Sequence, residues 1–155
     1  IHPGTDCEID DDDYGISKRE ARKLILNESS NVKIIKTSII GHELKTNYSF
    51  LDWFLNSNNS VYGYTNVFWN GNTTLQWAKV CHDLVQNWNS FSVETIISTK
   101  CISKHDLLKI IKNVYKKNIQ ISKDPKLSVN KCLADGIQMI PIKDQLVELK
   151  FFYSK

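Results

Sequence analysis

The stretch DDDDYGISKREAR, Asp10 to Arg22, decides how the rest of the chain is interpreted. Its acidic run ends at Asp13, and apolar residues at helical spacing then predict a helix from Tyr14 to about Asn27. Tyr14 and Lys18 stand four positions apart, so both side chains are expected on one face of this helix. A lysine ammonium beside a phenol favours the phenolate form. By itself the stretch is more typical of an exposed helix start with a solvated lysine. The alternative is a pair that acts as general acid or base on a carbonyl or an alcohol.

The composition indicates one globular domain. The chain has 155 residues, of which 41% are apolar and 24% are charged. A formal net charge of +3 with scattered basic residues disfavours nucleic acid as a partner. Apolar stretches are too short to cross a membrane, and no secretory signal is present, so we expect a cytoplasmic protein without membrane contact. Because the chain begins with Ile1 and its only methionine is Met139, we expect it to be a piece of a longer polypeptide.

The residue types that bind metals are not spaced as metal sites require. The four cysteines lie far apart without a CxxC pair: Cys7, Cys81, Cys101 and Cys132. We therefore expect no zinc site and reduced, mostly buried thiols, as is typical of a cytosolic protein. A calcium loop with Gly15 at its sixth position would have Ala21 where a glutamate is needed, which excludes that reading. The acidic run is expected to be an exposed lead-in to the helix.

Helical and extended segments alternate along the chain. The β-branched run VKIIKTSIIG, Val32 to Gly41, predicts a buried parallel strand. Further strands are predicted at Val61–Trp69, Glu94–Lys100 and Ile119–Ser122, and further helices at Ser49–Leu55, after Thr73 or Thr74, after Ser103 and from Pro141 to about Phe152. This alternation predicts an α/β fold. Neither GxGxxG nor GxxxxGK[ST] occurs, so the chain has no recognisable cradle for a pyrophosphate.

The order YGISK, strand, TSIIGHE resembles the second half of the extended short-chain dehydrogenase/reductase family. More narrowly, the chain is similar to the dTDP-4-dehydrorhamnose reductase-like enzymes that act on nucleotide sugars. Further stretches share this similarity: LDWFL, GYTN, WNGNTTLQWAKV, ISKHDLLKII and PIKDQLVEL. The resemblance implies the C-terminal part of a Rossmann-type doubly wound parallel sheet with a small α/β substrate-binding region. Residues 1–41 would end the dinucleotide-binding domain, and residues 42–155 would mainly form the substrate-binding region, partly interwoven with the sheet.

A mechanism follows from the resemblance. Hydride would pass between NAD or NADP and a sugar carbon while Tyr14 exchanges a proton with the sugar oxygen. Lys18 would support Tyr14 and hydrogen-bond the nicotinamide ribose. Thr37, Ser38 and Ile39 would lie beside the nicotinamide carboxamide and bind the cofactor. They stand at the carboxyl end of the strand, where ligands bind in open α/β sheets.

The resemblance assigns the substrate side to loops further along the chain. His42, Trp69 and Asn70 would line the sugar-nucleotide pocket, although ordinary loop packing is the slightly better explanation for His42 and Trp69. The family's Gly-rich loop, its selector between NAD and NADP and its catalytic Ser or Thr are all expected upstream of this chain. Arg22 stands where the family often has Glu, and Lys36 where it more often has Arg. Because the Gly-rich loop, the cofactor selector and the catalytic Ser or Thr are not in this chain, the isolated chain is expected to be inactive.

The expected function is the NAD(P)-dependent reduction of a nucleotide-linked 4-keto-6-deoxy sugar for surface polysaccharide. Two alternatives stay open. An epimerase or dehydratase of the same superfamily would share the tyrosine and lysine, whereas a non-catalytic half-domain would serve only as a scaffold. The resemblance also implies a homodimer through the Tyr14 helix.

Overall fold

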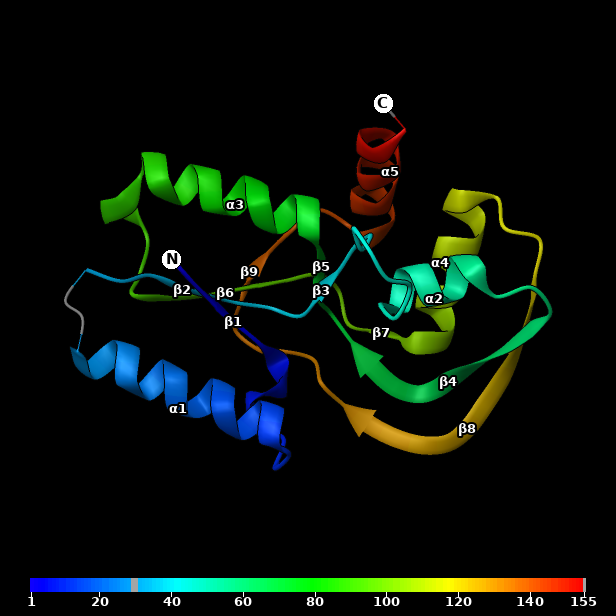
Figure 1. The fold of residues 1–155 in the computed structure, drawn as a ribbon, viewed down its shortest axis with the longest axis horizontal. Helices are drawn as coiled ribbons and strands as arrows, with labels where there is room; N and C mark the ends of the chain where they lie inside the picture. Colours follow the sequence, from blue (N-terminus) through cyan, green and yellow to red (C-terminus); the bar gives the residue numbers. More distant parts are fainter. Residues whose placement is uncertain (29–30, 155) are drawn as a thin grey trace.

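A computed structural model describes residues 1–28 and 31–154. Its main sheet has four parallel strands in the order β1-β2-β6-β9. These strands are β1 (His2–Gly4), β2 (Ile34–Lys36), β6 (Glu94–Ser98) and β9 (Ile137–Gln138). Helix α1 (Asp13–Glu28) lies on one side of this sheet and α3 (Thr74–Gln86) on the other (Figure 1). The predicted doubly wound α/β architecture is therefore confirmed.

A second region is built around a long strand. Strand β4 (Ser60–Trp69) pairs antiparallel with β7 (Ile102–Ser103) and parallel with β8 (Gln120–Asn130). A two-stranded parallel sheet, β3 (Ile39–Ile40) with β5 (Asn72–Thr73), links this region to the main sheet (Figure 1). The remaining elements are η1 (Asp6–Ile9), α2 (Phe50–Asn56), η2 (Trp88–Ser90), α4 (Lys104–Tyr115) and α5 (Ile142–Tyr153). The predicted division at residue 41 stays a prediction.

Two clusters of buried side chains stabilise the two regions. A smaller cluster joins the sheet to α3 through Ile35, Val80, Leu84 and Ile97. The larger cluster includes Leu107, Leu108 and Ile111 of α4 with Leu146 and Leu149 of α5. All these residues are almost or fully inaccessible to solvent, and removing such apolar surface from water is the main favourable term in folding. No helix in the described ranges is long and apolar enough to span a membrane.

Several predicted elements differ from the observed ones. The single strand predicted over Val32–Gly41 is two strands, β2 and β3, which belong to different sheets. The chain changes sheet at Ser38, whose carbonyl accepts a hydrogen bond from the Asn72 amide at 2.8 Å. Strand β8 continues well past Ser122, because it follows β4 across an irregularity in the pairing register. The short elements β1 and η1 were not predicted.

The expectation of four reduced thiols is wrong for Cys101 and Cys132, which form a disulfide. Their separation of 31 residues hides the pairing in the sequence. In the fold, Phe68 of β4 pairs with β7 on one side and with β8 on the other. The segments flanking those two strands therefore meet at the end of β4. Cys7 and Cys81 are free and half-buried.

Candidate functional site

A pocket of about 340 Å³ lies at the carboxyl ends of β1 and β2. Its polar lining comes from Thr5, Tyr14, Lys18 and Thr37, and the rest of its lining from Pro3, Gly4, Ile39 and Trp77. The fold thus brings together four residues that the sequence proposed for catalysis or cofactor binding: Tyr14, Lys18, Thr37 and Ile39. Their roles remain predictions, but their convergence on one pocket is a structural fact.

Tyr14 and Lys18 reach this pocket from the first turns of α1. The Asp12 carboxylate accepts a hydrogen bond from the Gly15 amide at 2.7 Å and so satisfies a free amide at the helix start. The Lys18 Nζ atom lies 5.7 Å from the centre of the Tyr14 ring. The phenol is 53% exposed, which leaves it open to a ligand. The predicted same-face arrangement is therefore present.

Thr5 is a pocket residue that the sequence did not predict. It follows β1 directly, and its hydroxyl donates to Asp6 Oδ1 at 3.1 Å and accepts from the Cys7 amide at 3.2 Å. A hydroxyl side chain therefore lies in the same pocket as Tyr14. From the family resemblance, the catalytic Ser or Thr was expected upstream of this chain. The available sequence signal was faint: a three-residue strand followed by Thr5 and Asp6.

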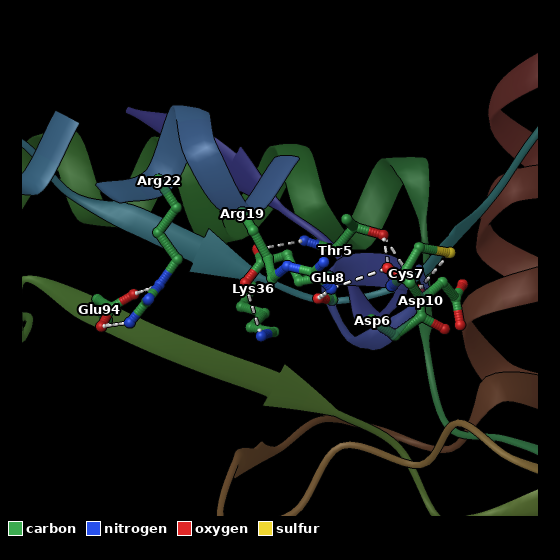
Figure 2. Close-up of polar contacts among 9 residues, drawn as sticks. All are labelled: Thr5, Asp6, Cys7, Glu8, Asp10, Arg19, Arg22, Lys36 and Glu94. Atoms are coloured by element: carbon green, nitrogen blue, oxygen red, sulfur yellow. Dashed lines mark hydrogen bonds and ion pairs between the residues drawn. The ribbon is translucent and has the colours of Figure 1, made fainter. Parts of the chain in front are cut away.

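Buried charges hold Thr5 in place (Figure 2). The Glu8 carboxylate accepts from the Thr5 amide at 3.3 Å and pairs with Lys36 Nζ at 2.9 Å. Arg19 of α1 donates to the carbonyl oxygens of Glu8 and Asp10, each at 2.8 Å. These contacts tie the turn after β1 to both β2 and α1. They fix Thr5 relative to the helix that carries Tyr14.

The two departures from the family pattern each find a partner within this chain. Lys36 pairs with Glu8, as described above, and Arg22 forms a two-pronged ion pair with Glu94 of β6 (Figure 2). Hydrogen bonding by Glu94 raises the pKa of Arg22. Both substitutions are therefore accommodated by local charge pairing on the α1 side of the sheet.

Thr37 is anchored from below the pocket by a buried polar network. Its hydroxyl accepts from the Asn72 side chain at 2.9 Å and donates to the Ser38 carbonyl at 3.1 Å. Gln145 of α5 donates to Asn72 Oδ1 at 2.9 Å. Because Asn72 and Gln145 are fully buried, these bonds satisfy groups that would otherwise be costly. Ser38 supplies its carbonyl to this network and is not among the described residues that line the pocket.

The predicted substrate residues lie elsewhere. His42 is held between Asp52 Oδ1 at 2.7 Å and the Tyr115 hydroxyl at 3.0 Å. Trp69 is 3% exposed, and Asn70 exchanges two hydrogen bonds with the Leu133 backbone. Within the described part of the chain, none of the three lines the pocket. Their proposed contact with substrate stays a prediction.

Burial and nearby charges shift the pKa values of two groups close to the pocket lining. Burial, and then the neighbouring Asp6, raise the pKa of the Cys7 thiol. Burial, and then the positive charge of Lys18, lower the pKa of His2. The described residues contain no group of three or more His, Cys, Asp or Glu side chains that could hold a metal ion. Proton transfer by Tyr14, with Lys18 and Thr5 in the same pocket, stays a prediction.

No family model matches the sequence, and no curated protein matches it significantly. Solved structures do match. The dTDP-4-dehydrorhamnose reductase of Bacillus anthracis, in complex with NADP, is 13% identical and superposes with a TM-score of 0.77 over 99% of this chain and 65% of its own. A dTDP-4-dehydrorhamnose reductase of Clostridium acetobutylicum is 15% identical and superposes with a TM-score of 0.78. The match covers 99% of this chain and 65% of that reductase.

The chain has the fold of these reductases. It spans about 65% of their length. The same fold relates it to DesIV of Streptomyces venezuelae, a dTDP-glucose 4,6-dehydratase with NAD and TYD bound. That match is 14% identical, has a TM-score of 0.63, and covers 99% of this chain and 59% of the dehydratase. The reductase fold thus confirms the fold expected from the YGISK and TSIIGHE stretches.

Proposed function

We propose that this chain carries the proton-transferring part of an NAD- or NADP-dependent reductase of nucleotide-linked 4-keto-6-deoxy sugars. The observation that carries the proposal is the pocket itself. It joins Tyr14, Lys18 and Thr5 to Thr37 and Ile39 at the carboxyl ends of parallel strands, which is where open α/β sheets bind nucleotides. The reductase fold supports the same assignment.

The chain's own residues divide the work. A nicotinamide bound in the pocket would supply hydride. Tyr14 donates the proton to the carbonyl oxygen of the sugar, and Lys18 stabilises the phenolate that remains. The Thr5 hydroxyl would donate to the same oxygen after turning its proton away from Asp6 Oδ1. Lys18 also offers an ammonium to a ribose hydroxyl of the nicotinamide side.

We expect the pocket to bind the nicotinamide end of a dinucleotide, whereas the pyrophosphate end needs groups that these residues do not supply. The sequence contains no Gly-rich phosphate loop. The proposal therefore places the remaining cofactor contacts outside this chain and expects the isolated chain to be inactive. We further propose a cytoplasmic location, where the Cys101–Cys132 disulfide is an unusual feature. We also propose a homodimer contact on α1, where Ile16 and Leu24 are 42% and 61% exposed.

The test is a substitution in the intact protein that removes only the phenol oxygen. Tyr14→Phe should lower kcat for reduction of a dTDP- or GDP-linked 4-keto-6-deoxy sugar by about 10² to 10⁴. Tyr48→Phe is the matched control, because that phenol is 89% exposed and lies outside the pocket. A wild-type rate in Tyr14→Phe would refute the mechanism.

A second candidate, dehydration or epimerisation, is favoured by one observation, the shared fold of the Streptomyces venezuelae dehydratase. Product analysis separates the two. A reductase consumes one reduced cofactor for each product, whereas a dehydratase or an epimerase returns its cofactor unchanged. If neither reaction occurs in the intact protein, a scaffolding role becomes the better proposal.

A further inference from the structure

Trp77 is a second aromatic side chain in the lining of the pocket, beside Tyr14. It comes from the first turn of α3, which lies on the opposite side of the sheet from α1 (Figure 1). The pocket therefore receives an aromatic side chain from each helix layer. Neither the sequence pattern nor the family resemblance pointed to Trp77.

The indole of Trp77 packs against the buried core on one side of the sheet. Helix α3 is capped by Thr73, whose hydroxyl accepts from the Gln76 amide at 3.2 Å. Trp77 is partly buried and packs against the cluster that includes Ile35 and Leu84. Because this packing already restricts the side chain, a ligand that contacts it loses less conformational entropy on binding.

The pocket walls differ in chemistry. Pro3, Ile39 and Trp77 offer apolar surface, while Tyr14, Lys18 and Thr5 offer hydrogen-bonding groups. A flat ring with a polar substituent matches both walls, because its faces favour aromatic contact and its edge needs hydrogen bonds. The nicotinamide ring has this form. Its oxidised state also carries a positive charge, which an indole attracts more strongly than a neutral ring.

We propose that Trp77 is the stacking surface for nicotinamide in this pocket and that it favours the oxidised ring over the reduced one. The inference rests on the proposed function and adds to it the residue that sets the relative affinity of the two cofactor states. Replacing Trp77 should therefore weaken binding of the cationic ring more than binding of the neutral ring.

The experiment uses nicotinamide mononucleotide and its reduced form, because these probes need only the nicotinamide part of the site. Dissociation constants are measured on the intact protein by NMR titration. Trp77→Leu should weaken binding of the oxidised probe by about threefold to tenfold and of the reduced probe by about twofold or less. The oxidised probe should also produce a charge-transfer absorbance with the wild type that Trp77→Leu lacks.

Trp88→Leu is the matched control, because Trp88 packs against the same cluster but does not line the pocket. It should leave both affinities unchanged. Trp77→Phe keeps an aromatic ring and should give an intermediate loss of affinity for the oxidised probe. This variant also replaces Trp77→Leu in the test if Trp77→Leu does not fold.

Three results would overturn the proposal. Unchanged affinities in the Trp77 variants would remove Trp77 from the site while leaving the proposed function intact. Equal losses for both probes would refute the preference for the oxidised ring. If the intact wild-type protein binds neither probe, the pocket is not a nicotinamide site, and the proposed function fails together with the role of Trp77.

Discussion

Gly15 shows how closely α1 approaches the turn after β1. A Cβ atom at this position would lie 2.5 Å from the carbonyl oxygens of both Cys7 and Asp10, closer than real Cβ contacts allow. These atoms are backbone and cannot move aside cheaply. A glycine in the first turn therefore allows the helix that carries Tyr14 to pack directly on the turn that carries Thr5.

We predict that Gly15→Ala lowers the free energy of unfolding by about 1–3 kcal/mol. Alanine improves helix propensity by about 1 kcal/mol, but overpacking against fixed backbone outweighs that gain. Urea denaturation measures the change. Ser17→Ala, at an exposed position of the same helix, should stay within about 0.5 kcal/mol of the wild type. A Gly15→Ala variant as stable as the wild type would contradict the close approach.

Lys104 is a partly buried cation that forms no ion pair with a carboxylate among the described residues. Its Nζ atom lies 4.6 Å from the centre of the Phe50 ring and 4.9 Å from that of Trp69. Burial lowers the pKa of Lys104 from 10.5 to about 8. Between these two values the unfolded chain holds more protons at this site than the folded chain, so this group makes the protein more stable as the pH rises.

The corresponding prediction compares the wild type with Lys104→Met. The free energy of unfolding of the wild type, relative to the variant, should increase by about 2 kcal/mol between roughly pH 7.5 and 9.5. Other titrating groups, such as the Cys7 thiol, are common to both proteins and cancel in the difference. Urea denaturation at the two pH values provides the measurement, and parallel pH profiles would show that Lys104 is not responsible.

At the scale of elements, the sequence pattern predicted helices that are stabilised by interactions within the helix itself. Helix α1 was expected from Tyr14 to about Asn27 and runs from Asp13 to Glu28, because apolar spacing and the acidic start act within the helix itself. Strand β1 was missed, because its three residues are a strand only through pairing with β2.

The candidate site divides in the same way. Tyr14 and Lys18 lie one helical turn apart and could be read from spacing alone. Thr5 follows β1, and Trp77 comes from a helix on the other side of the sheet. Neither residue carries a periodic signal that connects it to Tyr14, because their proximity depends on how separate elements pack.

The turn between β1 and α1 depends on the ion pair of Glu8 with Lys36. The Glu8 side chain is 6% exposed and that of Lys36 21%, so loss of the lysine leaves a carboxylate buried without its cation. Lys36→Met should therefore lower the free energy of unfolding by about 3–5 kcal/mol. Hydrogen exchange should also accelerate at the Thr5 amide, which donates to Glu8.

Lys79→Met is the matched control, because Lys79 pairs with Glu148 at 2.7 Å while both side chains are over 40% exposed. It should cost less than about 1 kcal/mol. Equal effects of the two substitutions would mean that Glu8 is hydrated and that the pair does not hold the turn.

At the scale of the whole molecule, two devices connect parts far apart in the sequence. Gln145 of α5 reaches Thr37 through Asn72, so the last helix supports the edge of the pocket. The disulfide of Cys101 with Cys132 joins the segments beside β7 and β8, and neither cysteine lines that pocket. The hydrogen-bond chain supports the pocket, and the disulfide supports the β4 sheet. Their effects on ligand affinity and on stability can therefore be measured separately.

We predict that replacing both Cys101 and Cys132 by Ser lowers the free energy of unfolding by about 2–4 kcal/mol, because a closed loop of 31 residues restricts the unfolded chain. Affinity for nicotinamide mononucleotide should not change. Urea denaturation without reductant measures the loss, and wild-type protein with reductant should match the double variant. Cys81→Ser, which removes a free thiol, should cost less than about 1 kcal/mol. If the double variant and the oxidised wild type unfold at the same urea concentration, the cross-link does not stabilise the β4 sheet.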